Sequence, residues 1–166
     1  MKKLLNTVLI AAVAVVLSAC DDDKPKKLIT FHLANPVWIE SANTRTQMVM
    51  PVSGVNLIVN NIEFMYSGDL ERIDLAQVET ADGGKIDGFQ FVCNSRGRKR
   101  LYTQSASNLN AYIVVLFGEE PIAARRIDMV LGDGKFFAIS ELPAGKDLVK
   151  FKDELNESVK TVEELK

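Results

Sequence analysis

The sequence predicts an α+β domain: a mostly antiparallel sheet packed with a central helix over about 95–108 and a C-terminal helix over about 146–165. Three β-rich runs, 112–117, 122–131 and 136–140, are separated by glycine-marked turns, a pattern typical of an antiparallel meander. The first helix is predicted by a polar capping residue at its start, and the second by apolar residues spaced three and four apart.

The first part of the domain is expected to be rich in strands. Residues 28–34 alternate well enough to form a first strand, which an Asn-Pro pair ends. Residues 40–54 are polar and mixed, with proline and glycine as punctuation. Two apolar pieces, 55–59 and 62–66, flank a pair of asparagines, which indicates a hairpin.

The middle of the domain is expected to hold a short helical turn and a second hairpin. Residues 69–76 are predicted as the helical turn, with a serine or an aspartate to cap it. Residues 77–80 and 89–93 flank the sequence Asp-Gly-Gly-Lys at 82–85. Glycine tolerates positive φ, so this sequence favours a turn between two strands.

The central helix begins with a dense group of cations. Asn94 or Ser95 is placed to cap the helix, and four basic side chains follow within five residues: Arg96, Arg98, Lys99 and Arg100. A solvated first turn is the simpler interpretation. However, cations are disfavoured at a helix N-terminus, which is itself positive. The alternative is therefore that these four residues contact an acidic partner or a lipid headgroup.

The C-terminal helix carries an apolar stripe. Its members follow steps of three and four, with charged residues between them: Leu148, Phe151, Leu155, Val159 and Val162. The stripe is expected to pack on the domain's own sheet. An amphipathic helix that grips a partner is the alternative.

Residues 1–19 are predicted to be a signal peptide. Two lysines precede an apolar stretch, and Leu17-Ser18-Ala19-Cys20 ends it, matching the lipobox of bacterial lipoproteins in all four positions. Cys20 is then the attachment site for lipid, including palmitate, and becomes the first residue of the mature chain. A retained anchor helix is the alternative, because the uncharged run is close to the ~30 Å needed to span a bilayer.

Residues 20–27 are expected to be the lipidated cysteine and a short polar tether, followed by a single periplasmic domain over 28–166. Seven extended residues span at most about 25 Å, so the domain would stay close to its membrane. Asp21 resembles the sorting signal that retains enterobacterial lipoproteins in the inner membrane. These residues predict a lipid-anchored protein on the periplasmic face of the inner membrane.

Charge excludes one class of partner. The sequence holds 20 basic and 22 acidic side chains, and loss of the two lysines of the signal peptide leaves 18 against 22. A net charge near −4 offers no general attraction to nucleic acid. The bilayer, reached through the acylated Cys20, is the partner that the sequence indicates directly.

No catalytic constellation is present in the sequence. The lone His32 falls on a predicted strand, Cys93 is expected to be a buried core thiol rather than a redox or catalytic one, and Glu119 and Glu120 are adjacent and point apart. One histidine without a cysteine pair does not make a metal site. We therefore expect no enzyme activity, no catalytic residue, no metal and no cofactor.

From about 61 to 142 the order of glycine and hydrophobic positions resembles the head subdomain of the first large periplasmic domain of SecD and SecDF, the translocase accessory proteins. The positions that carry the resemblance are Gly68-Asp69-Leu70, Phe89-Gln90-Phe91, Ser95 to Leu101, Tyr112 to Gly118 with Pro121-Ile122, and Leu131 to Gly134. The resemblance implies an α+β domain that contacts unfolded or membrane-emerging polypeptides.

The sequence also departs from that family. Phe117 and Glu119 stand where the family has an acidic residue and a lysine, and the Asp-Leu-Arg-Gly-Gly signature and following membrane segments are absent from the sequence, so proton coupling is not expected. We expect a non-enzymatic protein-binding accessory module linked to protein export or envelope assembly, with the Sec machinery or exported polypeptides as partners. The alternative is a small-ligand or lipid-binding domain, with residues 112–117 and 136–137 lining its pocket.

Overall fold

The computed structural model describes residues 27–38 and 44–164. The predicted signal peptide, the predicted lipid attachment site Cys20 and the predicted sorting residue Asp21 lie outside the described residues. No helix in the described part of the chain is both long and apolar enough to cross a bilayer.

The described residues form nine strands, two α-helices and one short 3-10 turn. The helices are α2 (Ser95–Ser107) and α3 (Leu148–Glu164), and the turn is η2 (Ser67–Asp69). The strands are β1 (Ile29–Asn35), β2 (Arg45–Val49), β3 (Asn56–Asn60), β4 (Met65–Tyr66), β5 (Leu70–Glu79), β6 (Lys85–Cys93), β7 (Tyr112–Phe117), β8 (Glu120–Arg126) and β9 (Lys135–Ser140).

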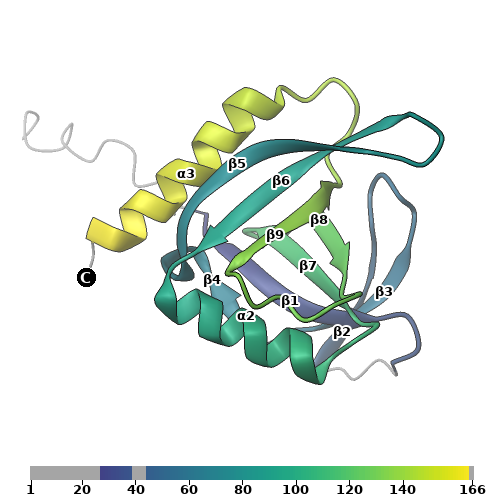
Figure 1. Ribbon diagram of the computed structural model, residues 1–166, viewed down its shortest axis with the longest axis horizontal. Helices are drawn as coiled ribbons and strands as arrows, with labels where there is room; N and C mark the ends of the chain where they lie inside the picture. Colours follow the sequence, from purple (N-terminus) through teal and green to yellow (C-terminus); the bar gives the residue numbers. More distant parts are fainter. Residues whose placement is uncertain (1–26, 39–43, 165–166) are drawn as a thin grey trace, which may run out of the picture.

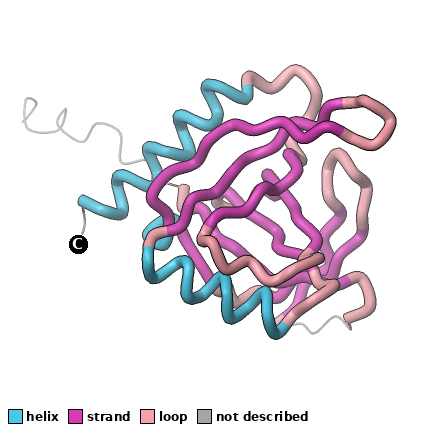
Figure 2. Tube along the Cα trace, in the orientation of Figure 1, coloured by secondary structure: helices cyan, strands magenta, loops and turns pink. Residues whose placement is uncertain are grey.

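The nine strands make one sheet: eight follow the order β2-β3-β1-β7-β8-β9-β6-β5, and β4 pairs with β1 off this path. Every pair is antiparallel. Figure 1 shows the sheet strongly curved, with α3 beside β5 and α2 on the other side of the molecule in that view. Figure 2 shows the strands wrapping around a common interior, with the two helices at its margin. The α+β prediction, its central helix and its C-terminal helix are confirmed, as is the meander, formed by β7, β8 and β9.

The helical turn predicted over 69–76 is wrong, because β5 runs through these residues. A β-bulge between Leu70 and Arg72 shifts the pairing with β6 by one residue. As a result Leu70 and Ile73 are both buried although they are three residues apart. The bulge thus gives a strand the apolar spacing of a helix, and only Ser67–Asp69 adopts a helical turn.

The hairpin predicted at Asn60 and Asn61 is also wrong. β3 and β4 pair with β1 rather than with each other, Ala34 facing Val59 and Phe31 facing Met65. The two pieces therefore follow one another along the same edge of β1, interrupted at 61–64. The actual hairpin joins β3 to β2, whose largely exposed and polar residues gave no apolar alternation.

Buried side chains gather on both faces of the sheet. The larger cluster is centred on Phe31, whose ring meets the rings of Phe91 and Phe136 at centroid distances of 5.3 and 5.9 Å. It also contains Phe151 and Leu155 of α3, together with Val159, so the stripe of the C-terminal helix packs on the domain's own sheet as predicted. The smaller cluster joins the β2–β3 hairpin to β1, β7 and β8 through Ala34, Met50, Leu57, Val59, Val114 and Ala124.

A chain of hydroxyl groups fastens the start of β1. The Ile29 N–H donates to the Ser67 hydroxyl at 2.9 Å, and that hydroxyl lies 3.0 Å from the hydroxyl of Ser158 on α3. Ser158 donates in turn to the carbonyl of Lys27 at 2.9 Å. Because Ser67 and Ser158 are both buried, these bonds are shielded from water, and they join β1, η2 and α3 at one point.

Candidate functional site

The four cations at the start of α2 do not act as one group. Arg96 and Arg100 turn toward Asp69, the last residue of η2, whose side chain is fully buried. Arg96 Nε lies 2.5 Å from Asp69 Oδ1, and Arg100 Nη1 lies 3.0 Å from Asp69 Oδ2. We call Asp69, Arg96 and Arg100, with Tyr66, the Asp69 cluster.

Tyr66 completes this cluster. Its hydroxyl accepts a hydrogen bond from Arg96 at 3.0 Å, and its ring lies 5.3 Å from the Arg96 guanidinium carbon. Hydrogen bonds to Asp69 and Tyr66 raise the pKa of Arg96 above its ordinary value. The buried carboxylate explains how cations are tolerated at this helix N-terminus, because it compensates the repulsion from the helix dipole.

The cap of α2 lies against the same cluster. Asn94 accepts hydrogen bonds from the N–H groups of Arg96 and Gly97, as predicted for a capping residue, and donates to the carbonyl of Gly68. Gly97 packs on the carbonyl of Asp69 so closely that an added Cβ would overlap it. The sequence therefore places glycine at the point where α2 crosses η2.

Arg98 and Lys99 lie outside the Asp69 cluster. Arg98 donates to the carbonyl of Asp133 at 3.3 Å, and Lys99 is exposed. The loop over 127–134 thus runs beside α2, and a second bond, from the Leu131 N–H to the Ser105 hydroxyl at 2.9 Å, fixes it there.

Exposed apolar side chains lie on α2 and on the loop over 127–134 beside it. Tyr102 lies one helical turn after Arg98 and approaches Gly132 of the loop, while Met129 and Val130 of the same loop are also exposed. We call Arg98, Tyr102, Met129 and Val130 the α2 surface. Methionine, tyrosine and arginine are residue types enriched at protein-binding surfaces.

Of the four residues of this surface, only Arg98 is predicted from the sequence as a partner contact. Tyr102, Met129 and Val130 are not predicted, because the type of an apolar residue does not tell whether its side chain is exposed or buried. The contact that brings α2 to the loop is made across 26 residues by Ser105 and Leu131. A run of non-alternating residues at 127–134, with two apolar side chains next to a glycine, is the signal that could have drawn attention to it.

The titratable groups singled out from the sequence lie in separate places. Cys93 is buried, as predicted, and burial raises the pKa of its thiol to about 12. His32 is buried on β1, where Nδ1 lies 2.8 Å from the Asn60 carbonyl and Nε2 lies 2.9 Å from the Thr30 hydroxyl. Burial lowers the pKa of His32 below its usual range.

Glu119 is exposed in the turn between β7 and β8, and Glu120, exposed at the start of β8, pairs with Lys27 at 3.5 Å. Within 27–38 and 44–164, no three or more histidine, cysteine, aspartate or glutamate side chains are grouped to hold a metal ion.

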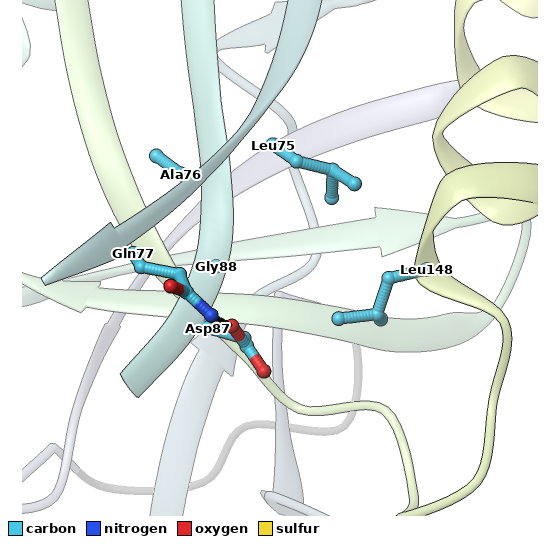
Figure 3. Close-up of a pocket in the computed structure, with 6 residues that line it drawn as sticks. All are labelled: Leu75, Ala76, Gln77, Asp87, Gly88 and Leu148. Atoms are coloured by element: carbon cyan, nitrogen blue, oxygen red, sulfur yellow. Dashed lines mark hydrogen bonds between the residues drawn. The ribbon is translucent and has the colours of Figure 1, made fainter. Parts of the chain in front are cut away.

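Two of the pockets on the described surface bear on the predicted sites. The first, of about 370 Å³, lies between β5, β6 and the start of α3, and Figure 3 shows Leu75 and Leu148 facing one another across it. The second, of about 340 Å³, lies under the loop over 127–134 and is lined by Arg125, Met129 and Phe137, among others. Of the residues predicted to line a ligand pocket, Phe136 and Phe137 line the second one, whereas Ile113 and Val115 are packed in the larger core.

The described residues thus form an α+β domain with a curved antiparallel sheet, and the α2 surface is exposed on it. No protein-family model and no curated protein matches the sequence. Solved structures that share the fold include two of SecDF, the first described as a membrane component that enhances protein export and the second as its super-membrane-facing form. The likeness to SecD and SecDF expected from the sequence is thus supported for the fold.

The two likenesses cover most of this chain. The first has a TM-score of 0.51 at 11% identity, and the second has a TM-score of 0.52 at 12% identity, each over 82% of this chain. This chain spans 63% of the first SecDF chain and 19% of the second. At this identity the comparison establishes the fold of the domain.

Proposed function

We propose that this protein is a non-enzymatic accessory module that binds other proteins in the periplasm, close to the membrane, and that its work is linked to protein export. The observation that carries the proposal is the α2 surface, where Tyr102 of α2 is exposed beside a loop whose Met129 and Val130 are exposed as well. Tyr102 is the only exposed aromatic side chain among the described residues, and folding alone gives no reason to expose it beside further apolar residues. The fold shared with SecDF supports the link to export.

The lipobox supports a membrane anchor. Cys20 carries the lipid in this proposal, Asp21 retains the protein in the inner membrane, and the tether up to residue 27 keeps the domain near the bilayer. An anchored domain finds partners that are themselves at the membrane more readily than a free one, because its effective concentration there is higher.

The absence of an enzymatic role is supported by the state of the reactive groups. The thiol of Cys93 is held protonated by burial, and His32 is enclosed by its contacts with Asn60 and Thr30. Neither faces the α2 surface as a nucleophile or a base would face a substrate.

In-cell photo-crosslinking tests the proposal. A photoreactive amino acid is placed at Met129, which is 59% exposed, and the matched control is Val149 on α3, which is 58% exposed. We expect Met129 to form adducts with Sec components or exported polypeptides, Val149 to form few, and the adducts to disappear with Cys20→Ala. Equal yields at both positions, or no adducts at Met129, would reject the α2 surface as the partner site.

A small-ligand role is the second candidate, because the pocket of about 340 Å³ under the loop over 127–134 holds Phe136 and Phe137 together with Arg125. One buried atom of Arg125, Nε, has no hydrogen-bond partner among the described residues. A native mass spectrum of the full chain would show a bound molecule that Phe137→Ala releases. An unliganded mass for the wild type would dismiss this role.

A further inference from the structure

The free edge of β5 is partly closed by one side chain. β5 is the last strand in the sheet order and, within the described residues, pairs with β6 alone. On its other side the Asn156 amide of α3 takes the place of a neighbouring strand. The Ile73 N–H donates to Asn156 Oδ1 at 2.9 Å, and Asn156 Nδ2 donates to the Ile73 carbonyl at 2.8 Å.

Beyond Ile73 the same edge is open. Alternate residues of a strand direct their N–H and C=O groups to the same side, so Leu75, Gln77 and Glu79 present theirs as Ile73 does. All three have exposed side chains. In Figure 1 the end of the β5–β6 hairpin projects past the rest of the sheet and away from α3. An uncovered strand edge of this kind is a template for a further strand.

A pocket lies beside this edge. Leu75 and Leu148 face one another across it, and Gln77 closes one side by donating to Asp87 at 2.6 Å (Figure 3). Gly88 has no room for a side chain, because an added Cβ would come within 2.5 Å of the Phe137 ring. The pocket of about 370 Å³ suits an apolar side chain of moderate size.

The hairpin that carries the edge is acidic. Residues 70–93 hold five acidic and two basic side chains. Arg72, one of the two cations, is already paired with Asp74 at 3.0 Å. The remaining acidic side chains of the hairpin therefore outnumber its one remaining basic side chain, Lys85. Charge complementarity therefore favours a basic partner and disfavours an acidic one.

We infer that the edge of β5 from Leu75 to Glu79 binds an extended polypeptide segment that carries both apolar and basic residues on one face. The segment adds a strand to the sheet, an apolar side chain enters the Leu75–Leu148 pocket, and basic side chains on the same face of the segment lie near Glu79 and Asp87, which share that face of the hairpin with Leu75. This edge is separate from the α2 surface and does not depend on the partner proposed there.

Peptides modified on alternate amides provide the test. The probe is a fluorescent nine-residue peptide with valine and lysine at its odd positions and threonine at its even positions, added to the full chain in detergent micelles and followed by fluorescence anisotropy. N-methylation of the amides that face β5 should weaken binding roughly tenfold, because the backbone hydrogen bonds are lost. N-methylation of the other alternate amides should leave binding unchanged, and a valine–glutamate peptide should bind weakly.

Two variants of the chain complete the test. Gln77→Pro removes an outward N–H that β6 does not use and should abolish the difference between the two N-methylated peptides. Gln77→Ala is the control that loses only the side chain. Circular dichroism identifies any variant that fails to fold, and in that case Glu79→Pro with its control Glu79→Ala replaces the pair.

The following results would overturn the inference. Equal binding of both N-methylated peptides would exclude strand addition, and no binding of the unmodified peptide would exclude the segment proposed. A dimer of the full chain that Gln77→Pro dissociates would identify the occupant as a second copy. None of these results affects crosslinking at Met129, so the two proposals fail or stand separately.

Discussion

The two helices are attached to the same sheet in different ways. α3 contributes Phe151, Leu155 and Val159 to the larger core, and its attachment is mainly apolar. α2 buries only Gly97, Leu101 and Ser105, and it is held by the Asp69 cluster and by its cap. Apolar burial supplies most of the favourable free energy of folding, but it does not fix the position of a helix closely because it is non-directional. Ion pairs and caps have a defined geometry and fix the residue at which a helix begins. The helix that carries the candidate partner surface is thus the one positioned by polar contacts.

The largest expected loss of stability comes from weakening the apolar attachment of α3. Phe151→Ala removes a buried ring that meets Phe117 edge-on at a centroid distance of 5.7 Å, and it should lower the free energy of unfolding by about 3–5 kcal/mol. The control is Val149→Ala, since Val149 is exposed on the same helix. Urea unfolding measures both, and a Phe151→Ala loss close to the control's would mean that α3 is not held by its stripe.

Asp69→Asn tests the polar attachment. It removes the charge that Arg96 and Arg100 share and should cost roughly 1.5–3 kcal/mol. Hydrogen exchange should show the loss of protection mainly in α2, whereas Phe151→Ala should expose α3. Asp74→Asn, which breaks an exposed pair with Arg72, is the control and should cost less than about 1 kcal/mol. An equal loss of protection in both helices would contradict the conclusion that α2 is held mainly by polar contacts and α3 mainly by apolar ones.

The cap of α2 should contribute less to the stability of the domain than the Asp69 cluster does. Asn94→Ala deletes the acceptor for the N–H groups of Arg96 and Gly97 and should cost about 1 kcal/mol. Asn94→Ser keeps an acceptor at this position and should recover most of that loss. Thermal unfolding of the three proteins provides the measurement. If Asn94→Ser were as unstable as Asn94→Ala, the stabilising contact of Asn94 would be its hydrogen bond to the Gly68 carbonyl rather than the cap.

The smallest effect concerns pH and involves neither helix. Burial lowers the pKa of His32 in the folded protein, so below about 6.5 the unfolded chain takes up a proton that the folded one resists. Stability should therefore fall as the pH drops below that value. His32→Gln should flatten this fall in urea titrations at pH 7.5 and 5.5, while Phe151→Ala and Asp69→Asn should retain it. An unchanged slope in His32→Gln would show that other groups cause the fall.

The sequence was informative where a structural period is regular. The stripe from Leu148 to Val162 and the meander after Tyr112 were both predicted, because each repeats one spacing over its whole length. β5 was misread because a bulge breaks its period, and β2 was missed because an edge strand with polar residues lacks an apolar alternation.

The candidate site was less predictable than the fold. The basic residues of α2 were visible, but their buried partner Asp69 lies 27 residues before Arg96. The spacing between such partners is set by the path of β5 and β6, which no local pattern encodes. The exposed apolar residues Met129 and Val130 depend on how the loop is held against α2, and this too is a tertiary property.

The hydroxyl chain at the start of β1 has a mechanical consequence. Whatever precedes Lys27 enters the domain where the Lys27 carbonyl is bound by Ser158 and the Ile29 N–H is bound by Ser67. β1 is then held along its length by pairing with β7 from Ile29 to Ala34. A pull on the N-terminus would load these bonds together, in shear, before any strand could peel away. The domain is thus built to resist tension at the end of the chain that faces the membrane in our proposal.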